Sequence, residues 1–195
     1  MQKLTVNSYR HMVWKNGGGN TTERAISPQD ATLLTFDWRI SSALVAMPGP
    51  FSAFAGIDRS LVILNGAAMV LQLPNSESKV LEVSSTPFVF AGEIAVTASL
   101  PAGPVTDFNV MTRRARCRHA LAPCPVIGTK SIAAQGDLLI LSHVNGDNVV
   151  CQDQDAGEEM TLLSGETLIL RRDDAIKYTL TAQRAMLFAV DLTWN

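Results

Sequence analysis

Three arginines in the first half of the chain have the charge needed to bind a small carboxylate. Arg39 lies inside an apolar run, Arg59 stands immediately before one, and Arg113 ends another. A hydrogen bond to a charged group contributes about 1.5–3 kcal/mol, so two arginine contacts with apolar burial predict micromolar affinity after the entropic cost of binding. These residues therefore predict an anion-binding pocket.

Polar side chains accompany the arginines with the period of a β-strand. In the run from Asp107 to Arg113, alternation places Asp107, Asn109 and Met111 on the same face as Arg113, and an acid, an amide and a base in one row either meet solvent or line a pocket. We predict a pocket in which some residues supply charge, some fix orientation and some form walls. Its predicted ligand-binding residues are Trp14, Asn16, Thr22, Glu23, Trp38, Arg39, Ser41, Phe51, Ser52, Phe54, Arg59, Phe90, Asp107, Asn109, Met111 and Arg113.

The segment from Trp14 to Arg24 contains three consecutive glycines, Gly17 to Gly19, flanked by aromatic, amide, hydroxyl and acidic side chains. Glycines allow the backbone to approach a ligand closely, and the flanking groups offer a stacking face and hydrogen bonds. The Gly-Lys-Ser/Thr ending of a phosphate loop is absent, as are the spaced glycines of a dinucleotide site. The segment predicts either a ligand-binding loop or a flexible surface turn.

The histidines and cysteines give little support for metal or nucleophile chemistry. His11, His119 and His143 form no His-x-His pair, and no Gly-x-Ser-x-Gly turn occurs. We expect no metal, no cofactor and no catalytic residue. The alternative is a metal-free isomerase or epimerase with Glu23 or Asp107 as general base, but neither His nor Tyr stands among the polar motifs as the opposing acid.

Strands are predicted almost throughout the chain, because runs rich in Val, Leu, Ile, Phe and Thr recur between turn signals, one of which is Arg172–Asp174. Asn65-Gly66 separates Leu61–Leu64 from Met69–Leu71 and predicts a tight hairpin. Asn145-Gly146 predicts a second turn of the same kind. Helical periodicity is scarce. The fold class is therefore all-β.

The chain also resembles itself at an offset of 80 residues, which aligns Asn65-Gly66 with Asn145-Gly146 and Phe108 with Phe188. Turns and apolar positions recur, whereas Arg59 and Asp107 fall on leucines. This period suits two fused small domains, predicted at 1–119, which carries the pocket, and 126–195, with the proline-containing connector between them. Two consecutive jelly-roll barrels, a bicupin, are the predicted architecture, and a single lipocalin-like barrel is the alternative.

The amino-acid composition and net charge limit the kinds of partner that we expect this protein to bind. Of the 195 residues, 47% are hydrophobic and 17% charged, with a net charge of −2, which offers no general field for nucleic acid or an anionic membrane. The basic cluster from Arg113 to His119 is expected to be a connector. The sequence shows neither a membrane span nor a signal peptide, and its three cysteines fit no disulfide framework. We expect a cytoplasmic protein with a small carboxylate as partner. The sequence is compatible with a homodimer but does not decide the oligomeric state.

The same motifs, taken in order, resemble the HutD/Ves family. The resemblance covers essentially the whole chain, although its motifs lie in about the first 115 residues. They are the segments Trp14–Glu23, Trp38–Ala43, Gly49–Arg59, Phe88–Glu93 and Asp107–Arg113.

The resemblance implies a bicupin of two RmlC-like barrels and, for HutD-like members, a link to bacterial histidine utilisation. The implied role is a modulator that senses urocanate or formylglutamate, and no established enzymatic activity comes with the family. Ves-like members are associated with a cold response instead. The run Gly17-Gly18-Gly19 is closer to the HutD side.

Overall fold

The computed structural model describes residues 1–171 and 177–195, and the predicted turn at Arg172–Asp174 lies outside them. Strands dominate the described residues, and the helices among them are two short 3-10 turns, η1 (Val6–Ser8) and η2 (Pro74–Ser76). The all-β prediction is confirmed. Within the described part of the chain, no helix has the length and apolarity to cross a membrane.

The chain divides into two compact units. The first unit is Tyr9–Cys117, and the second unit is Met1–Ser8 together with Arg118–Asn195. The N-terminal residues therefore belong with the C-terminal part of the chain, through strand β1 (Gln2–Leu4), which pairs antiparallel with β16 (Thr167–Arg171). The assignment of 1–119 and 126–195 to two separate barrels stays a prediction.

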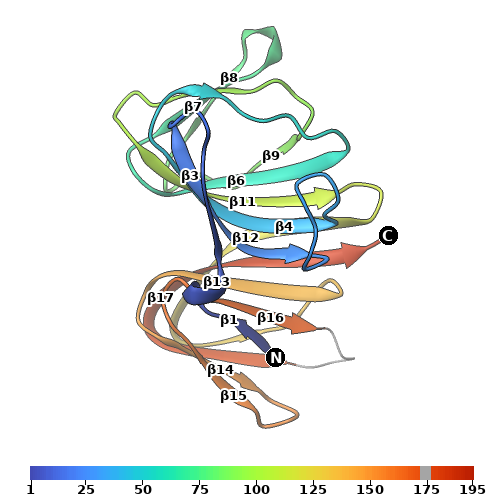
Figure 1. The fold of residues 1–195 in the computed structure, drawn as a ribbon. Coiled ribbons are helices and arrows are strands. Elements are labelled where there is room, and N and C mark those ends of the chain that lie inside the picture. Colours follow the sequence, from blue (N-terminus) through green and yellow to red (C-terminus); the bar gives the residue numbers. More distant parts are fainter. Residues whose placement is uncertain (172–176) are drawn as a thin grey trace. The chain divides into compact units, whose positions relative to one another are not determined.

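The first unit contains two antiparallel sheets (Figure 1). One sheet has the order β2-β3-β4-β11-β6-β9, and the other has the order β5-β10-β7-β8. Their strands are β2 (Arg10–Val13), β3 (Gly19–Ser27), β4 (Trp38–Val45), β5 (Gly49–Pro50), β6 (Ile57–Asn65), β7 (Met69–Gln72), β8 (Ser78–Leu81), β9 (Phe88–Ala91), β10 (Thr97–Ser99) and β11 (Val105–Arg113).

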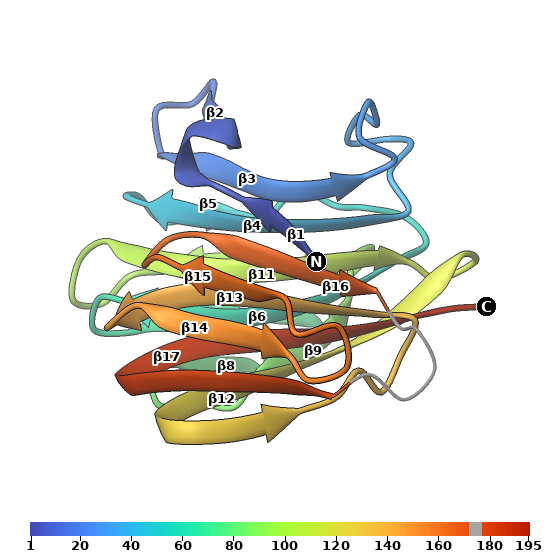
Figure 2. The ribbon, with the colours of Figure 1, turned by 90° about the horizontal axis from the view of Figure 1, so that it is seen from below.

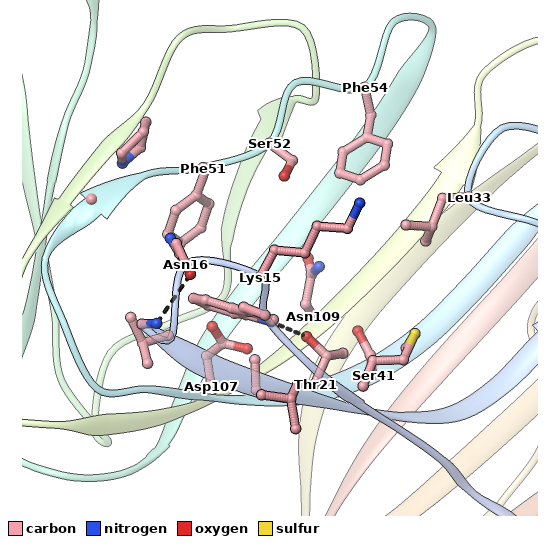
Figure 3. A pocket seen from close by; sticks show the side chains of 18 of the residues that line it. Lys15, Asn16, Thr21, Leu33, Ser41, Phe51, Ser52, Phe54, Asp107 and Asn109 are labelled. Atoms are coloured by element: carbon pink, nitrogen blue, oxygen red, sulfur yellow. Dashed lines mark hydrogen bonds between the residues drawn. The ribbon is translucent and has the colours of Figure 1, made fainter.

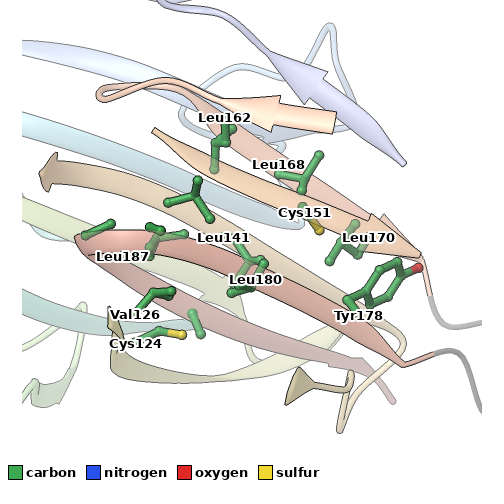
Figure 4. Close-up of a cluster of buried hydrophobic side chains, with 14 of the residues drawn as sticks. Cys124, Val126, Leu141, Cys151, Leu162, Leu168, Leu170, Tyr178, Leu180 and Leu187 are labelled. Carbon is green, nitrogen blue, oxygen red and sulfur yellow. The ribbon is translucent and has the colours of Figure 1, made fainter. Parts of the chain in front are cut away.

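The second unit is built on one sheet, in the order β1-β16-β13-β17-β14-β15, with β12 paired to β17 (Figure 2). Its remaining strands are β12 (Cys117–Ile132), β13 (Leu138–Gly146), β14 (Val149–Asp153), β15 (Glu159–Leu162) and β17 (Tyr178–Trp194). An apolar cluster that includes Leu141, Leu168, Leu180 and Leu187 forms its core (Figure 4).

The predicted hairpin at Asn65-Gly66 is wrong. Strand β6 pairs with β11 and β9, whereas β7 pairs with β10 and β8, so the turn passes the chain from one sheet to the other. Gly66 has a φ of +103°, and a Cβ there would lie 2.7 Å from the carbonyl oxygen of Pro104. The Asn-Gly signal identified the backbone conformation correctly, but positive φ also serves a turn between sheets.

Asn145-Gly146 has the same arrangement in the second unit. Gly146 has a φ of +100°, and a Cβ there would lie 2.4 Å from the carbonyl oxygen of Arg184. Strands β13 and β14, on its two sides, are likewise not paired with each other.

The predicted internal repeat is present in the strand register. Strand β6 pairs with β11 through Arg59↔Met111 and Ile63↔Asp107, and β13 pairs with β17 through Leu139↔Asp191 and His143↔Leu187. The second set is the first set advanced by 80 residues, and the irregularity in the ladder recurs at the matching position, before Asp107 and before Leu187. The pairing of β6 with β9 recurs in the same way as the pairing of β13 with β16.

Candidate functional site

A pocket of about 660 Å³ lies within the first unit (Figure 3). Its floor comes from alternate residues of β4 and β11 and from Arg59 of β6, and its wall comes from the segments around Trp14 and Phe51. Strand alternation selects these side chains, because the residues between them point to the opposite face of the sheet. The predicted ligand-binding residues that line it are Trp14, Asn16, Arg39, Ser41, Phe51, Ser52, Phe54, Arg59, Asp107, Asn109 and Met111.

Arg59 is one of two buried cations that line the pocket, with 6% of its surface exposed. Its guanidinium carbon lies 5.1 Å from the ring centroid of Phe51, 5.9 Å from that of Phe54 and 4.9 Å from that of Phe90. The Nη1 atom makes a long contact of 3.5 Å with the carbonyl oxygen of Ser52, and Nε has no hydrogen-bond partner among the described residues. Aromatic rings thus hold the group while one donor stays available for a ligand.

Burial lowers the pKa of Arg59 to about 10, an effect that the charge of Asp107 opposes and that of Arg39 reinforces. The guanidinium is therefore still charged at neutral pH. Arg39 and Arg59 both lie opposite Met111, one on each neighbouring strand, so the register itself brings the two cations to one level of the sheet.

Asp107 and Asn109 supply acceptors on the floor. They are 4% and 8% exposed, and neither Asp107 Oδ1 nor Asn109 Oδ1 has a hydrogen-bond partner among the described residues. Burial raises the pKa of Asp107 to about 7, with opposing contributions from Arg59 and from the hydrogen bond with the Ala43 backbone. Buried polar atoms without partners cost free energy, so their presence in a cavity favours a ligand that satisfies them.

Glu23 does not line the pocket but holds a residue that does. Its Oε2 accepts a hydrogen bond of 2.6 Å from Arg39 Nε, and both side chains are buried. Arg10, which is largely exposed, approaches Glu23 Oε1 at 3.6 Å. Glu23 therefore fixes the orientation of Arg39 and neutralises its charge.

The glycine-rich segment shapes one wall. Trp14 Nε1 donates to Thr21 Oγ1 at 2.8 Å, and Asn16 Oδ1 accepts from the backbone of Gly18 at 3.0 Å. A Cβ at Gly19 would lie 2.1 Å from the carbonyl oxygen of Leu44, so only glycine permits this close approach to β4.

Two further predicted residues, Thr22 and Trp38, lie on faces that the pocket does not use. Thr22 Oγ1 contacts His11 Nδ1 at 3.0 Å, whereas its neighbour Thr21 lines the pocket. Trp38 is buried and alternates with Arg39 along β4. Phe90 is also outside the lining and contributes through its contact with Arg59.

Arg113 is not brought to the pocket. Its Nε donates to the carbonyl oxygen of Phe36 at 2.9 Å, and its Nη2 donates to that of Leu34 at 2.8 Å. Both acceptors lie in the segment before β4, so this arginine anchors that segment to the end of β11.

Sequence reasoning missed several lining residues. Ala43 and Val45 continue the alternation of Arg39 and Ser41, so the strand pattern could have found them. Lys15 was present in the glycine-rich motif, but Leu33 and Met47 lie in irregular segments without a periodic signal. The missed residues are Met12, Val13, Lys15, Gly18, Thr21, Leu33, Ala43, Val45, Met47, Pro48, Gly49 and Pro50.

This is a β protein with a pocket that combines apolar walls with buried polar groups, and its fold is cupin-like. A cupin 2 conserved barrel domain protein from Leptotrichia buccalis superposes with a TM-score of 0.57 at 9% identity, covering 89% of this chain and 88% of that one, which supports the fold alone.

The HutD family model matches residues 6–188, and the chain belongs to the HutD/Ves family. Protein Ves from Citrobacter koseri is 33% identical over 159 residues, which cover 80% of this chain and 79% of that protein.

Two solved structures cover almost the whole chain. A conserved protein of unknown function from Pseudomonas aeruginosa PAO1 has a TM-score of 0.89 at 32% identity and covers 98% of both chains. HutD from Pseudomonas fluorescens SBW25 has a TM-score of 0.81 at 28% identity, covering 100% of this chain and 98% of that one.

Proposed function

We propose that this protein binds a small carboxylate metabolite in the pocket and acts as a modulator of histidine utilisation, with urocanate or formylglutamate as the ligand. The observation that carries the proposal is the buried Arg59, whose Nε lacks a partner beside two unpartnered acceptors, Asp107 Oδ1 and Asn109 Oδ1. A ligand with a carboxylate and a nearby N–H donor would satisfy all three atoms. Urocanate, through its imidazole, and formylglutamate, through its amide, both have such a donor.

The link to histidine utilisation rests on family membership and on the similarity to HutD from P. fluorescens. A sensor needs selective binding rather than turnover, and the pocket offers charge and orientation for that task. A cytoplasmic location accords with this role, because such metabolites arise inside the cell.

The finer fold assignment is also a proposal. The recurrence of the β6–β11 register in β13–β17 supports two jelly-roll barrels derived from one ancestor, that is, a bicupin. In this scheme the first barrel has kept a ligand pocket, and the corresponding positions of the second belong to an apolar core.

The binding experiment is thermal unfolding in the presence of urocanate, formylglutamate, histidine and glutamate. A ligand at about 100 times its dissociation constant adds about 2.7 kcal/mol to native stability, which raises the midpoint by roughly 5–10 °C in a chain of this size. We expect a selective rise that Arg59→Ala removes and that Arg118→Ala, at an exposed position in the second unit, preserves. A rise that survives Arg59→Ala would contradict the assignment of the pocket.

A second candidate function is general-base catalysis by Asp107. Its raised pKa of about 7 and its unpartnered oxygen are properties that a base requires. Glu23 is less suited, because Arg39 engages its carboxylate. Turnover of a bound ligand that Asp107→Asn abolishes, while binding persists, would favour this isomerase or epimerase over the sensor.

A further inference from the structure

Lys15 is a cation at the mouth of the pocket with no function in the proposed carboxylate site. It lines the pocket and is exposed, and in Figure 3 its side chain extends across the pocket in the direction of Phe54. No hydrogen bond or ion pair engages its ammonium group among the residues that the structure describes. Its charge is therefore free to meet a ligand.

The other lining cations are buried, and a carboxylate hydrogen-bonds one of them, Arg39, whereas Arg59 Nε has no hydrogen-bond partner among the described residues. Glu23 binds Arg39 at 2.6 Å, and Asp107 lies near Arg59 on the floor. Positive charge is consequently available at two depths, at buried Arg59 and at exposed Lys15. A ligand with one acid group would engage the deeper cation and leave Lys15 without a partner.

We propose that Lys15 is a specificity-determining residue that binds a second acidic group, so that the pocket selects dicarboxylates over monocarboxylates. This inference rests on the proposed function, because the first acid is taken to bind at Arg59. Phe51 and Phe54, which line the pocket and whose rings lie against the Arg59 guanidinium, would pack against the carbon chain that joins the two acids.

The test compares two probes of the same shape, N-formyl-L-glutamate and N-formyl-L-glutamine, which differ by one negative charge. Calorimetric titration is performed on the wild type, on Lys15→Met and on Lys79→Met, a control lysine exposed on β8. We expect the wild type to prefer the diacid by about fivefold, the size of one solvent-exposed ion pair. Lys15→Met should abolish the preference without weakening the amide probe, and Lys79→Met should behave as wild type.

Salt provides an independent check, because screening should reduce the preference for the diacid while the affinity for the amide probe falls less. Equal affinities in the wild type, or a preference that persists in Lys15→Met, would overturn the assignment of Lys15. If both probes bind equally and lose affinity in Arg59→Ala, the proposed carboxylate site survives and the Lys15 inference alone fails. Failure of both probes to bind at millimolar concentration would overturn both proposals.

Discussion

Strands β6 and β11 of the first unit and strands β13 and β17 of the second have the same register and different chemistry. Advancing Arg59, Asp107 and Asn109 by 80 residues gives Leu139, Leu187 and Ala189, and the backbone pairings correspond. The apolar set belongs to a packed core, and the polar set lines a pocket. The same strand register thus supports an apolar cluster in one unit and a pocket with buried polar groups in the other, depending on a few alternate side chains.

Compared with the apolar cluster of the second unit, the pocket lowers the stability of the first unit. Each buried polar atom without a partner costs about 1–3 kcal/mol relative to a satisfied one, and Arg59 Nε, Asp107 Oδ1 and Asn109 Oδ1 are such atoms. The leucines of the second copy avoid this cost and gain apolar burial. The first copy retains the cost, which a ligand could remove.

The largest effect is expected from Leu139→Arg. This variant places an arginine in the apolar core of the second unit, at the position that corresponds to Arg59. Leu139 is fully buried among apolar residues, so the charge would lack a partner and the free energy of unfolding should fall by about 3–5 kcal/mol. Urea unfolding measures the change. The reciprocal variant, Arg59→Leu, should lose carboxylate binding, and its loss of stability should be smaller because Asp107, left without its counter-charge, can take up a proton. Wild-type stability of Leu139→Arg would show that the second interior is not a filled core.

The equivalent turns should respond alike to Gly66→Ala and Gly146→Ala. Both positions have positive φ, and a Cβ would collide with backbone atoms at 2.7 and 2.4 Å, so each variant should lose about 2–3 kcal/mol. Gly103→Ala is the control, because its φ is +95° with open space around it, and it should lose only about 1 kcal/mol. Chemical denaturation of the three variants compares them. A large loss at one turn alone would argue against their structural equivalence.

An effect that is smaller per pH unit is expected at Asp107, whose position corresponds to Leu187 in the second unit. Its pKa is raised from 3.8 to about 7, so between these values the native state holds more protons than the unfolded state. Its contribution to stability should therefore fall as pH rises from about 4 to 7, by up to about 1.4 kcal/mol per pH unit, and level off above. Unfolding at pH 5, 6, 7 and 8 should show this slope in the wild type and a shallower one in Asp107→Asn. Parallel slopes would contradict the raised pKa.

The smallest effect on binding is expected from Arg113→Ala, whose position corresponds to Thr193 in the second copy. Carboxylate affinity should change by less than about threefold, because Arg113 bonds to Phe36 and Leu34 rather than lining the pocket. Calorimetric titration of Arg113→Ala and of Arg59→Ala with the same carboxylate compares the contributions of the two arginines to affinity. A loss of affinity as large as that of Arg59→Ala would show that Arg113 contributes to ligand binding.

Strand alternation was sufficient to predict much of the candidate site, and it was insufficient where strands end. Asp107, Asn109 and Met111 share a face within one uninterrupted strand, so the prediction placed them together. Arg113 has the same parity but is the last residue of β11, where its long side chain reaches backbone carbonyls instead. Thr21 lines the pocket and Thr22 does not, which the sequence could not predict because it does not reveal the register of β3, a strand that is irregular after Glu23.

Pairings between distant segments were beyond sequence reasoning. The turn residues at Asn65-Gly66 indicated a reversal of the chain but not that β6 and β7 join different sheets. Nothing local in Gln2–Leu4 indicates its partner β16, since that contact depends on the completed fold. Lys15 and Met47 were missed because irregular segments have no period from which a facing direction could be predicted.

The pairing of β1 with β16 has a consequence for synthesis of the protein in the cell. In the sequence, the first unit, Tyr9–Cys117, stands between the two segments that form the second. A ribosome therefore completes the first unit before it makes β16, the strand that pairs with Gln2–Leu4. At about 5–20 residues per second, β16 emerges roughly 10–30 s after β1. During that interval the nascent chain can contain a folded pocket while Gln2–Leu4 is unpaired, so the second unit is completed after the first.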